Sequence, residues 1–135
     1  MNKILVGTDT TASADMAVET AAELAGLRDA ELLVLHVRGP SAAHDAADPK
    51  KTPDPDRYLA SMRLRFPAIQ VRSWSETGDP ADRLVEIAEA ERVDTIVLGN
   101  RGVHGPRWRV RESVPNLVLR HAPCSVLIVD TRAAQ

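Results

Sequence analysis

Short apolar runs alternate with longer amphipathic segments along most of the chain. Continuous apolar runs predict buried strands over residues 3–8, 31–37, 94–98 and 125–129. A fifth run, over residues 69–74, alternates apolar and polar side chains, which is typical of a strand at a less buried edge of a sheet. The pattern therefore predicts five strands separated by helical segments.

Helices are predicted between these strands. Small apolar residues at helical spacing indicate a helix over 13–25, with Gly26 as its C-terminal stop. A modest helix is expected over 56–65. The sequence Asp-Pro-Ala-Asp at 79–82 gives the next helix an N-cap and a proline at its first helical position. A final helix is expected to begin at Ser-Val-Pro, residues 113–115, and to run to about residue 121.

Alternation of strands and helices predicts an α/β fold with a parallel sheet and helices on both faces, because right-handed crossovers leave few other arrangements. At 135 residues the chain is expected to form a single domain, residues 1–135. In such sheets a ligand binds beyond the carboxyl ends of the strands, where the strand order switches. This rule places Thr8, Asp9, Val37, Leu98 and Gly99 around one opening.

Composition narrows the class of protein. Hydrophobic residues make up 44% of the chain and charged residues 27%, which is globular composition, and the net charge of −2 provides no cationic field for nucleic acid or acidic membranes. No apolar run is long enough to cross a bilayer, and no signal-peptide pattern opens the chain. The single Cys124 fits a reducing compartment. We therefore expect a cytoplasmic protein.

Two long connections stand out. Residues 39–56 hold four of the nine prolines, so we expect a mobile loop. Residues 99–111 form a Gly- and Arg-rich connection between the strand at 94–98 and the helix that begins at 113. Glycines let backbone amides approach a ligand, and a helix N-terminus adds donors and a positive dipole, which suits phosphate. On composition alone, a flexible connection that needs glycine for its turns is an equally good interpretation.

Several motifs together resemble the universal stress protein family. The ATP-binding branch of that family carries Gly, two residues, Gly, nine residues, then Gly and Ser or Thr. Here Gly99 and Gly102 match the first two glycines and Ser113 matches the hydroxyl residue, with the spacing kept. The resemblance covers nearly the whole chain and is carried by residues 4–9, 77–80, 94–102, 113–116, 121–124 and 126–129.

Two positions depart from the family pattern. Glu112 replaces the third glycine, whose amide faces the phosphates in the family, so an acid there is expected to weaken triphosphate binding. Thr10 stands where the family usually has glycine after the aspartate that follows the first strand.

The resemblance implies a Rossmann-like sheet with strand order 3-2-1-4-5 and a homodimer paired through residues 125–130. It also implies a non-enzymatic stress-response regulator that binds ATP or a related adenine nucleotide such as AMP or cAMP, with Mg²⁺ as a candidate companion ion. An unknown protein partner would read the state of the 99–111 loop. The implied nucleotide-binding residues are Thr8, Asp9, Thr10, Val37, Leu98, Gly99, Arg101, Gly102, Glu112, Ser113 and Val114.

The resemblance implies a role for six of these residues. Asp9 would approach the ribose or phosphate side, and the backbone near Val37 would meet adenine. Gly99, Gly102, Ser113 and Val114 would hold ribose and phosphates. From the residues alone, Asp9 and Ser113 could instead act as helix caps. Four arginines surround Trp108, at positions 101, 107, 109 and 111. We interpret them as part of a solvated loop in preference to a phosphate contact or a partner surface.

Other functions remain open as alternatives. One is a dimer that has lost its nucleotide. Another is a slow ATPase or nucleotidyl transferase, for which Asp9 and Glu112 are the candidate bases. The pair His121 and Cys124 has no third ligand at metal spacing, so Cys124 is interpreted as a small core residue, and His36 in its apolar strand as a structural histidine. The P-loop, dinucleotide and nucleophile-elbow motifs are absent from the sequence.

Overall fold

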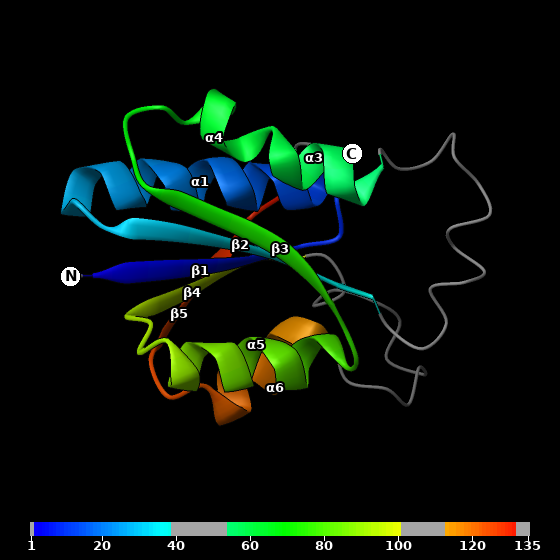
Figure 1. Cartoon of the computed structure of the whole chain (residues 1–135). Coiled ribbons are helices and arrows are strands. Elements are labelled where there is room, and N and C mark those ends of the chain that lie inside the picture. The colour runs from blue at the N-terminus through cyan, green and yellow to red at the C-terminus, as the bar shows by residue number, and fades with distance from the viewer. Residues whose placement is uncertain (1, 39–53, 101–112, 132–135) are drawn as a thin grey trace.

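A computed structural model describes residues 2–38, 54–100 and 113–131 of the chain. They form a five-stranded sheet in the order β3-β2-β1-β4-β5, in which every neighbouring pair is parallel (Figure 1). This confirms the predicted α/β fold and strand order. The strands are β1 (Lys3–Thr8), β2 (Glu31–Arg38), β3 (Val71–Thr77), β4 (Thr95–Gly99) and β5 (Ser125–Val129).

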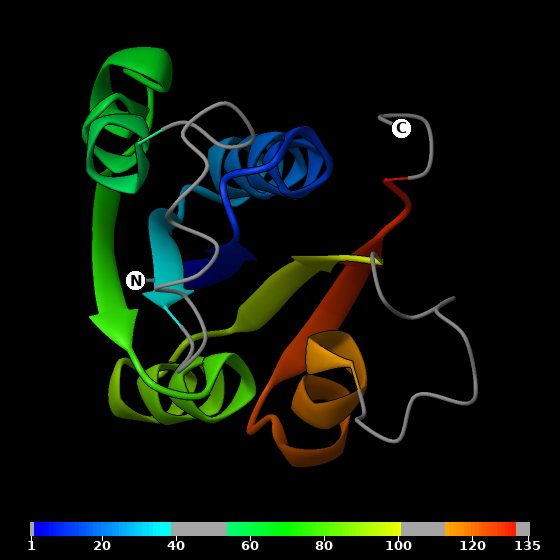
Figure 2. The same ribbon diagram turned by 90° about the vertical axis from the view of Figure 1, so that its right-hand side faces the viewer.

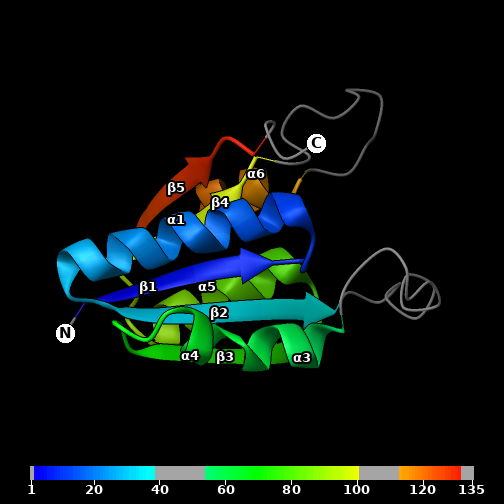
Figure 3. The same ribbon diagram turned by 90° about the horizontal axis from the view of Figure 1, so that it is seen from above.

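Helices cover both faces of the sheet, as Figure 2 shows. One face carries α1 (Ala12–Arg28), α3 (Pro55–Ala60) and α4 (Met62–Arg65), and the other carries α5 (Pro80–Ala90) and α6 (Val114–His121). Seen from above, α1 lies across β1 and β4, and α3 and α4 lie over β3 at one edge of the sheet (Figure 3). Within the described ranges, no helix is both long and apolar enough to cross a membrane.

Alternate residues of the central strands build two separate cores. Ile4 and Val6 of β1 pack with the alanines of α1 on one face, whereas Leu5 packs with α5 and α6 on the other. Residues 32–35 of β2 are all fully buried, as expected for a central parallel strand with helices on both sides. The inward face of α1 consists largely of alanine, which lets the helix approach the sheet closely.

The predicted stop of the first helix is wrong. The helix continues through Gly26 to Arg28 and ends at Asp29, which adopts a left-handed conformation with φ 52° and donates its backbone N–H to Ala25. Aspartate tolerates this conformation better than most residues. The conformation that usually favours glycine is therefore adopted by an aspartate three positions later.

Two further predicted boundaries change. The helix expected over 56–65 is divided at Ser61, whose hydroxyl donates to the Tyr58 carbonyl over 2.7 Å. The edge strand expected over 69–74 instead runs from Val71 to Thr77, because its pairing with β2 continues to Arg38. Pairing with a neighbouring strand thus overrides the local alternation of side chains.

The connection predicted to be mobile, residues 39–56, lies largely outside the described residues. Its last part does not form a loop: Asp54 caps α3, and its carboxylate accepts a hydrogen bond of 3.1 Å from the Asp56 amide.

Candidate functional site

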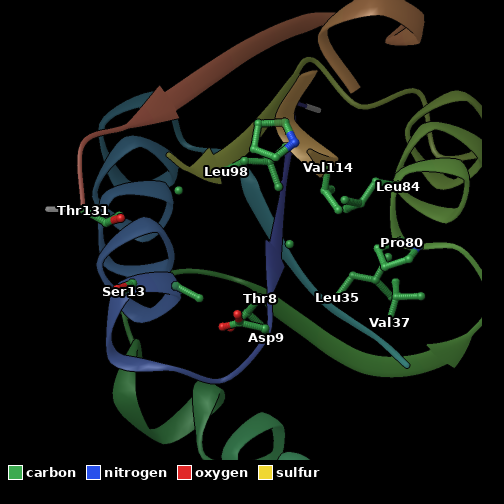
Figure 4. A pocket seen from close by; sticks show the side chains of 14 residues that line it. Thr8, Asp9, Ser13, Leu35, Val37, Pro80, Leu84, Leu98, Val114 and Thr131 are labelled. Atoms are coloured by element: carbon green, nitrogen blue, oxygen red, sulfur yellow. The ribbon is translucent and has the colours of Figure 1, made fainter. Parts of the chain in front are cut away.

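A pocket of about 410 Å³ opens at the carboxyl ends of β1, β2 and β4. This is the position predicted from the topology, because the strand order reverses direction between β1 and β4. Side chains from α1, α5 and α6 complete its walls (Figure 4). The lining residues are Gly7, Thr8, Asp9, Ser13, Ala14, Leu35, Val37, Pro80, Leu84, Leu98, Gly99, Val114, Pro115 and Thr131.

The pocket has two chemically different sides. Leu35, Val37 and Pro80 lie together on one side, and Ser13 and Thr131 lie across from them (Figure 4). The first side is apolar and suits an aromatic base, whereas the second offers hydroxyl groups. Asp9 and Thr8 lie between the two sides at the end of β1.

A tight turn between β1 and α1 fixes Asp9. Its Oδ1 accepts hydrogen bonds from the Thr11 amide (3.0 Å) and the Thr11 hydroxyl (2.5 Å). Thr10 has φ 67°, is buried, and donates its amide to the Thr8 hydroxyl over 2.9 Å. Because this backbone region is costly for a β-branched residue, the turn itself accounts for glycine at this position in the family pattern.

A hydrogen bond from α3 supports the first turn of α1. The Tyr58 hydroxyl donates to the Asp15 carboxylate. Burial raises the pKa of Tyr58 well above its usual range, and the neighbouring Asp15 carboxylate adds to this effect. The phenol therefore stays protonated and keeps α3 joined to the part of α1 that carries Ser13 and Ala14.

Two glycines keep the pocket open. A Cβ on Gly7 would lie 3.0 Å from Leu98 Cδ2 and 3.1 Å from Leu84 Cδ1. A Cβ on Gly99 would lie 3.1 Å from Thr131 Cγ2. Both positions therefore leave no room for a side chain unless a pocket wall moves.

Helix α6 begins at the pocket. The Ser113 hydroxyl accepts a hydrogen bond from the Asn116 amide over 3.3 Å, which makes Ser113 the N-cap, and Val114 then lines the pocket. The positive end of the helix dipole therefore lies near the pocket, although Pro115 has no N–H and the Asn116 amide is already bonded to Ser113.

The structure brings together more than half of the predicted site residues. Those that line the pocket are Thr8, Asp9, Val37, Leu98, Gly99 and Val114. Thr10 and Ser113 are each next in sequence to a lining residue but do not line the pocket themselves. Arg101, Gly102 and Glu112 lie outside the described residues. That any of these residues contacts a nucleotide stays a prediction.

Sequence reasoning missed several lining residues. Leu35 could have been found, because it lies two positions before Val37 and hence on the same face of β2. Pro80 and Leu84 carried a signal as the first turns of a well-marked helix. Thr131 carried none, because it follows the last strand and belongs to no motif.

The two residues interpreted as structural fit that interpretation. His36 Nδ1 lies 3.1 Å from the Ser75 hydroxyl, and burial, followed by the nearby Arg38 charge, lowers the pKa of the imidazole. Cys124 packs against the core between the sheet, α5 and α6, and burial raises the pKa of its thiol. No group of three or more potential metal ligands occurs in the described part of the chain.

Comparison with known proteins identifies the family of the chain. The model of the universal stress protein family matches residues 1–130. Universal stress protein Rv1636 of Mycobacterium tuberculosis is 32% identical over 95% of each chain. A solved universal stress protein in complex with cAMP is 29% identical, with a TM-score of 0.79 over 96% of this chain and 97% of the other. An Arabidopsis thaliana family protein with AMP bound, 20% identical over 100% of this chain and 95% of the other, shares the fold with a TM-score of 0.71. The chain therefore belongs to the universal stress protein family.

Proposed function

We propose that this protein binds an adenine nucleotide in the pocket at the ends of β1, β2 and β4, and acts as a non-enzymatic, homodimeric stress-response regulator. The observation that carries the proposal is the division of the pocket into an apolar side and a hydroxyl-bearing side at the switch in strand order. The related universal stress protein solved in complex with cAMP supports the choice of ligand.

The two sides suggest an orientation for the nucleotide. Adenine would lie against Leu35, Val37 and Pro80, where its flat apolar faces are buried. The ribose would then face the polar side, near Asp9. The phosphate would extend toward the start of α6, where the positive end of the helix dipole favours an anion.

Charge in the pocket favours a ligand with one phosphate. Among the described lining residues, Asp9 is the one acidic side chain, and none is Lys or Arg. A carboxylate and a phosphate about 5 Å apart repel by roughly 3 kcal/mol per unit charge at an effective dielectric of about 20. AMP or cAMP therefore suits this lining better than ATP does. The carboxylate of Glu112, which replaces the third glycine of the family motif, would also weaken the binding of ATP.

The same lining favours binding over hydrolysis. ATP cleavage needs a base that positions the attacking water, and Asp9 has its Oδ1 already engaged by two hydrogen bonds from Thr11. Slow turnover by Asp9 or Glu112 remains the alternative activity.

The dimer is proposed to form through β5. This strand lies at the edge of the sheet and is rich in apolar residues, with the Leu127 side chain 39% exposed. Such an edge favours the addition of another strand.

Co-purified ligand and calorimetry test the proposed function. Mass spectrometry of the denatured protein should detect an adenine nucleotide, and nucleotide-free protein should bind AMP and cAMP in calorimetric titrations. Absence of both results would support the nucleotide-free dimer instead. Release of labelled phosphate from ATP above the rate of a control that carries both Asp9→Asn and Glu112→Gln would contradict the non-enzymatic assignment.

A further inference from the structure

We propose that Thr131, held in place by Asn100, accepts a hydrogen bond from the ribose 2′-hydroxyl and thereby selects ribonucleotides over 2′-deoxyribonucleotides. This inference rests on the proposed function. It assigns a specificity role to a residue that follows the last strand and lies outside the family's phosphate motif.

Hydrogen bonds at both ends of the Asn100 amide fix its orientation. Its Nδ2 donates to the Asp130 carboxylate over 3.2 Å, and its Oδ1 accepts from the Thr131 backbone amide over 3.1 Å. A reversed amide would place two donors together at one end and two acceptors at the other. Asn100 Oδ1 is therefore an acceptor toward Thr131.

This orientation decides the role of the Thr131 hydroxyl. Thr131 Oγ1 lies 2.9 Å from Asn100 Oδ1, so Thr131 must be the donor in that hydrogen bond. A hydroxyl has one proton and two lone pairs. With its proton committed to Asn100, Thr131 can act toward a ligand as an acceptor.

Thr131 lies on the polar side of the pocket. It lines the pocket across from Leu35, Val37 and Pro80, although it is 1% exposed overall (Figure 4). The position of a Cβ on Gly99 would be 3.1 Å from Thr131 Cγ2 and 3.8 Å from the Ser13 carbonyl oxygen, so the three residues lie close together. The backbone bond from the Asn100 amide to the Val129 carbonyl (3.0 Å) further anchors this segment.

Acceptors on this side recognise a donor and not a phosphate. The Asp9 carboxylate and the committed Thr131 hydroxyl both offer lone pairs, which repel phosphate oxygens but are complementary to sugar hydroxyls. In cAMP the 3′-oxygen is part of the cyclic phosphate, which leaves the 2′-hydroxyl as the free sugar donor. The 2′-hydroxyl is therefore the one free sugar hydroxyl that AMP and cAMP share, and it is the group that Thr131 would recognise.

The effect should be measurable because a buried acceptor that loses its donor is costly. Leaving such a group unpaired costs about 1–3 kcal/mol, which corresponds to roughly fivefold to 150-fold in affinity. A site built around a hydroxyl therefore rejects the analogue that lacks it.

Calorimetric titration with three ligands tests the inference. AMP should bind the wild type at least about fivefold more tightly than 2′-deoxy-AMP, and 2′-fluoro-2′-deoxy-AMP should behave like the deoxy compound because fluorine cannot donate. Thr131→Val keeps the shape and the backbone hydrogen bond but removes the hydroxyl, so the AMP to 2′-deoxy-AMP ratio should fall to about twofold or less. Thr131→Ser should retain most of the wild-type ratio.

Each result decides one part of the account. A wild type that binds AMP and 2′-deoxy-AMP equally, or a Thr131→Val ratio equal to the wild-type ratio, would overturn the role of Thr131 while leaving nucleotide binding intact. A wild type that binds neither AMP nor cAMP would overturn the proposed function. If Thr131→Val fails to fold, the Thr131 methyl signal of isotope-labelled wild type should still shift more with AMP than with 2′-deoxy-AMP, and equal shifts would overturn the inference.

Discussion

Arg65 forms a bidentate salt bridge with Asp15. Nη1 donates to Asp15 Oδ1 over 2.6 Å and Nη2 to Oδ2 over 2.7 Å, which joins α4 to the first turn of α1. The Arg65 hydrogen bonds hold the pKa of Asp15 below its usual range, although burial opposes this shift. Because the same turn of α1 carries Ser13 into the pocket, the pair stabilises one wall of the site.

Replacing Asp15 should remove stability in a pH-dependent way. A lowered folded-state pKa means that the carboxylate stabilises the fold above its unfolded pKa of about 3.9, and that this contribution is lost as the pH falls. Asp15→Asn should therefore destabilise the protein by about 1–2 kcal/mol at pH 7 and by less at pH 3 in urea unfolding. Glu19→Gln serves as the control, because the Glu19 side chain is 63% exposed and should contribute under about 0.5 kcal/mol. A pH-independent loss in Asp15→Asn would contradict this assignment.

The left-handed conformation of Thr10 predicts a difference between two small substitutions. Thr10→Gly and Thr10→Ala both remove the hydroxyl and methyl groups and keep the amide that donates to Thr8. Only glycine adopts φ 67° without steric cost, so Thr10→Gly should be more stable than Thr10→Ala by about 1 kcal/mol. Equal unfolding midpoints in urea would show that the turn relaxes when the side chain is reduced.

The proposed dimer predicts the effect of charge on β5. Leu127→Lys places a cation on an exposed position of the edge strand, which should shift the protein from dimer to monomer in light scattering without loss of folded structure. Leu119→Lys is the matched control, because Leu119 is 52% exposed on α6, and it should leave the dimer intact. A monomeric wild type would contradict the dimer outright.

Proline at Leu127 would test the dimer less cleanly. The Val129 carbonyl faces β4, where it accepts a hydrogen bond from the Asn100 amide, and the backbone groups of Leu127, two residues earlier, point the same way. Leu127→Pro should therefore disturb pairing within the sheet and lower stability as well as association.

The altered phosphate motif predicts a change in nucleotide preference. Glu112→Gly should raise ATP affinity by about fivefold to thirtyfold, after screening reduces the repulsion to about 1–2 kcal/mol. AMP affinity should change much less, because the penalty falls on the outer phosphates. Calorimetric titration of both proteins with ATP and AMP measures the difference, and equal ATP affinities would show that Glu112 is harmless.

The fold could be predicted because its signals are local and repeated. Buried strands such as residues 31–37 are continuous apolar runs, and the Asp79 cap with Pro80 marks a helix start without ambiguity. The N-cap of α6 at Ser113 was equally clear. Because crossovers between parallel strands are right-handed, the alternation of strands and helices leaves few other arrangements.

Other features depend on contacts that sequence patterns do not reveal. Gly26 resembled a stop, yet the helix passes through it because a left-handed Asp29 closes the last turn. Thr131 enters the pocket because Asn100 holds it, and the two residues are 31 positions apart with no shared motif. In both places, hydrogen bonds formed in the folded chain determine the structure, and the local residue pattern does not reveal them.

Amide chemical shifts of the isotope-labelled wild type, recorded while AMP is added, test the central claim most directly. The account predicts saturable shifts at residues around the pocket, including Gly7, Val37, Leu98, Val114 and Thr131, with amides at the opposite ends of the strands, such as Glu31 and Val71, unchanged. Absence of saturable shifts, or shifts confined to residues away from the carboxyl ends of β1, β2 and β4, would contradict it.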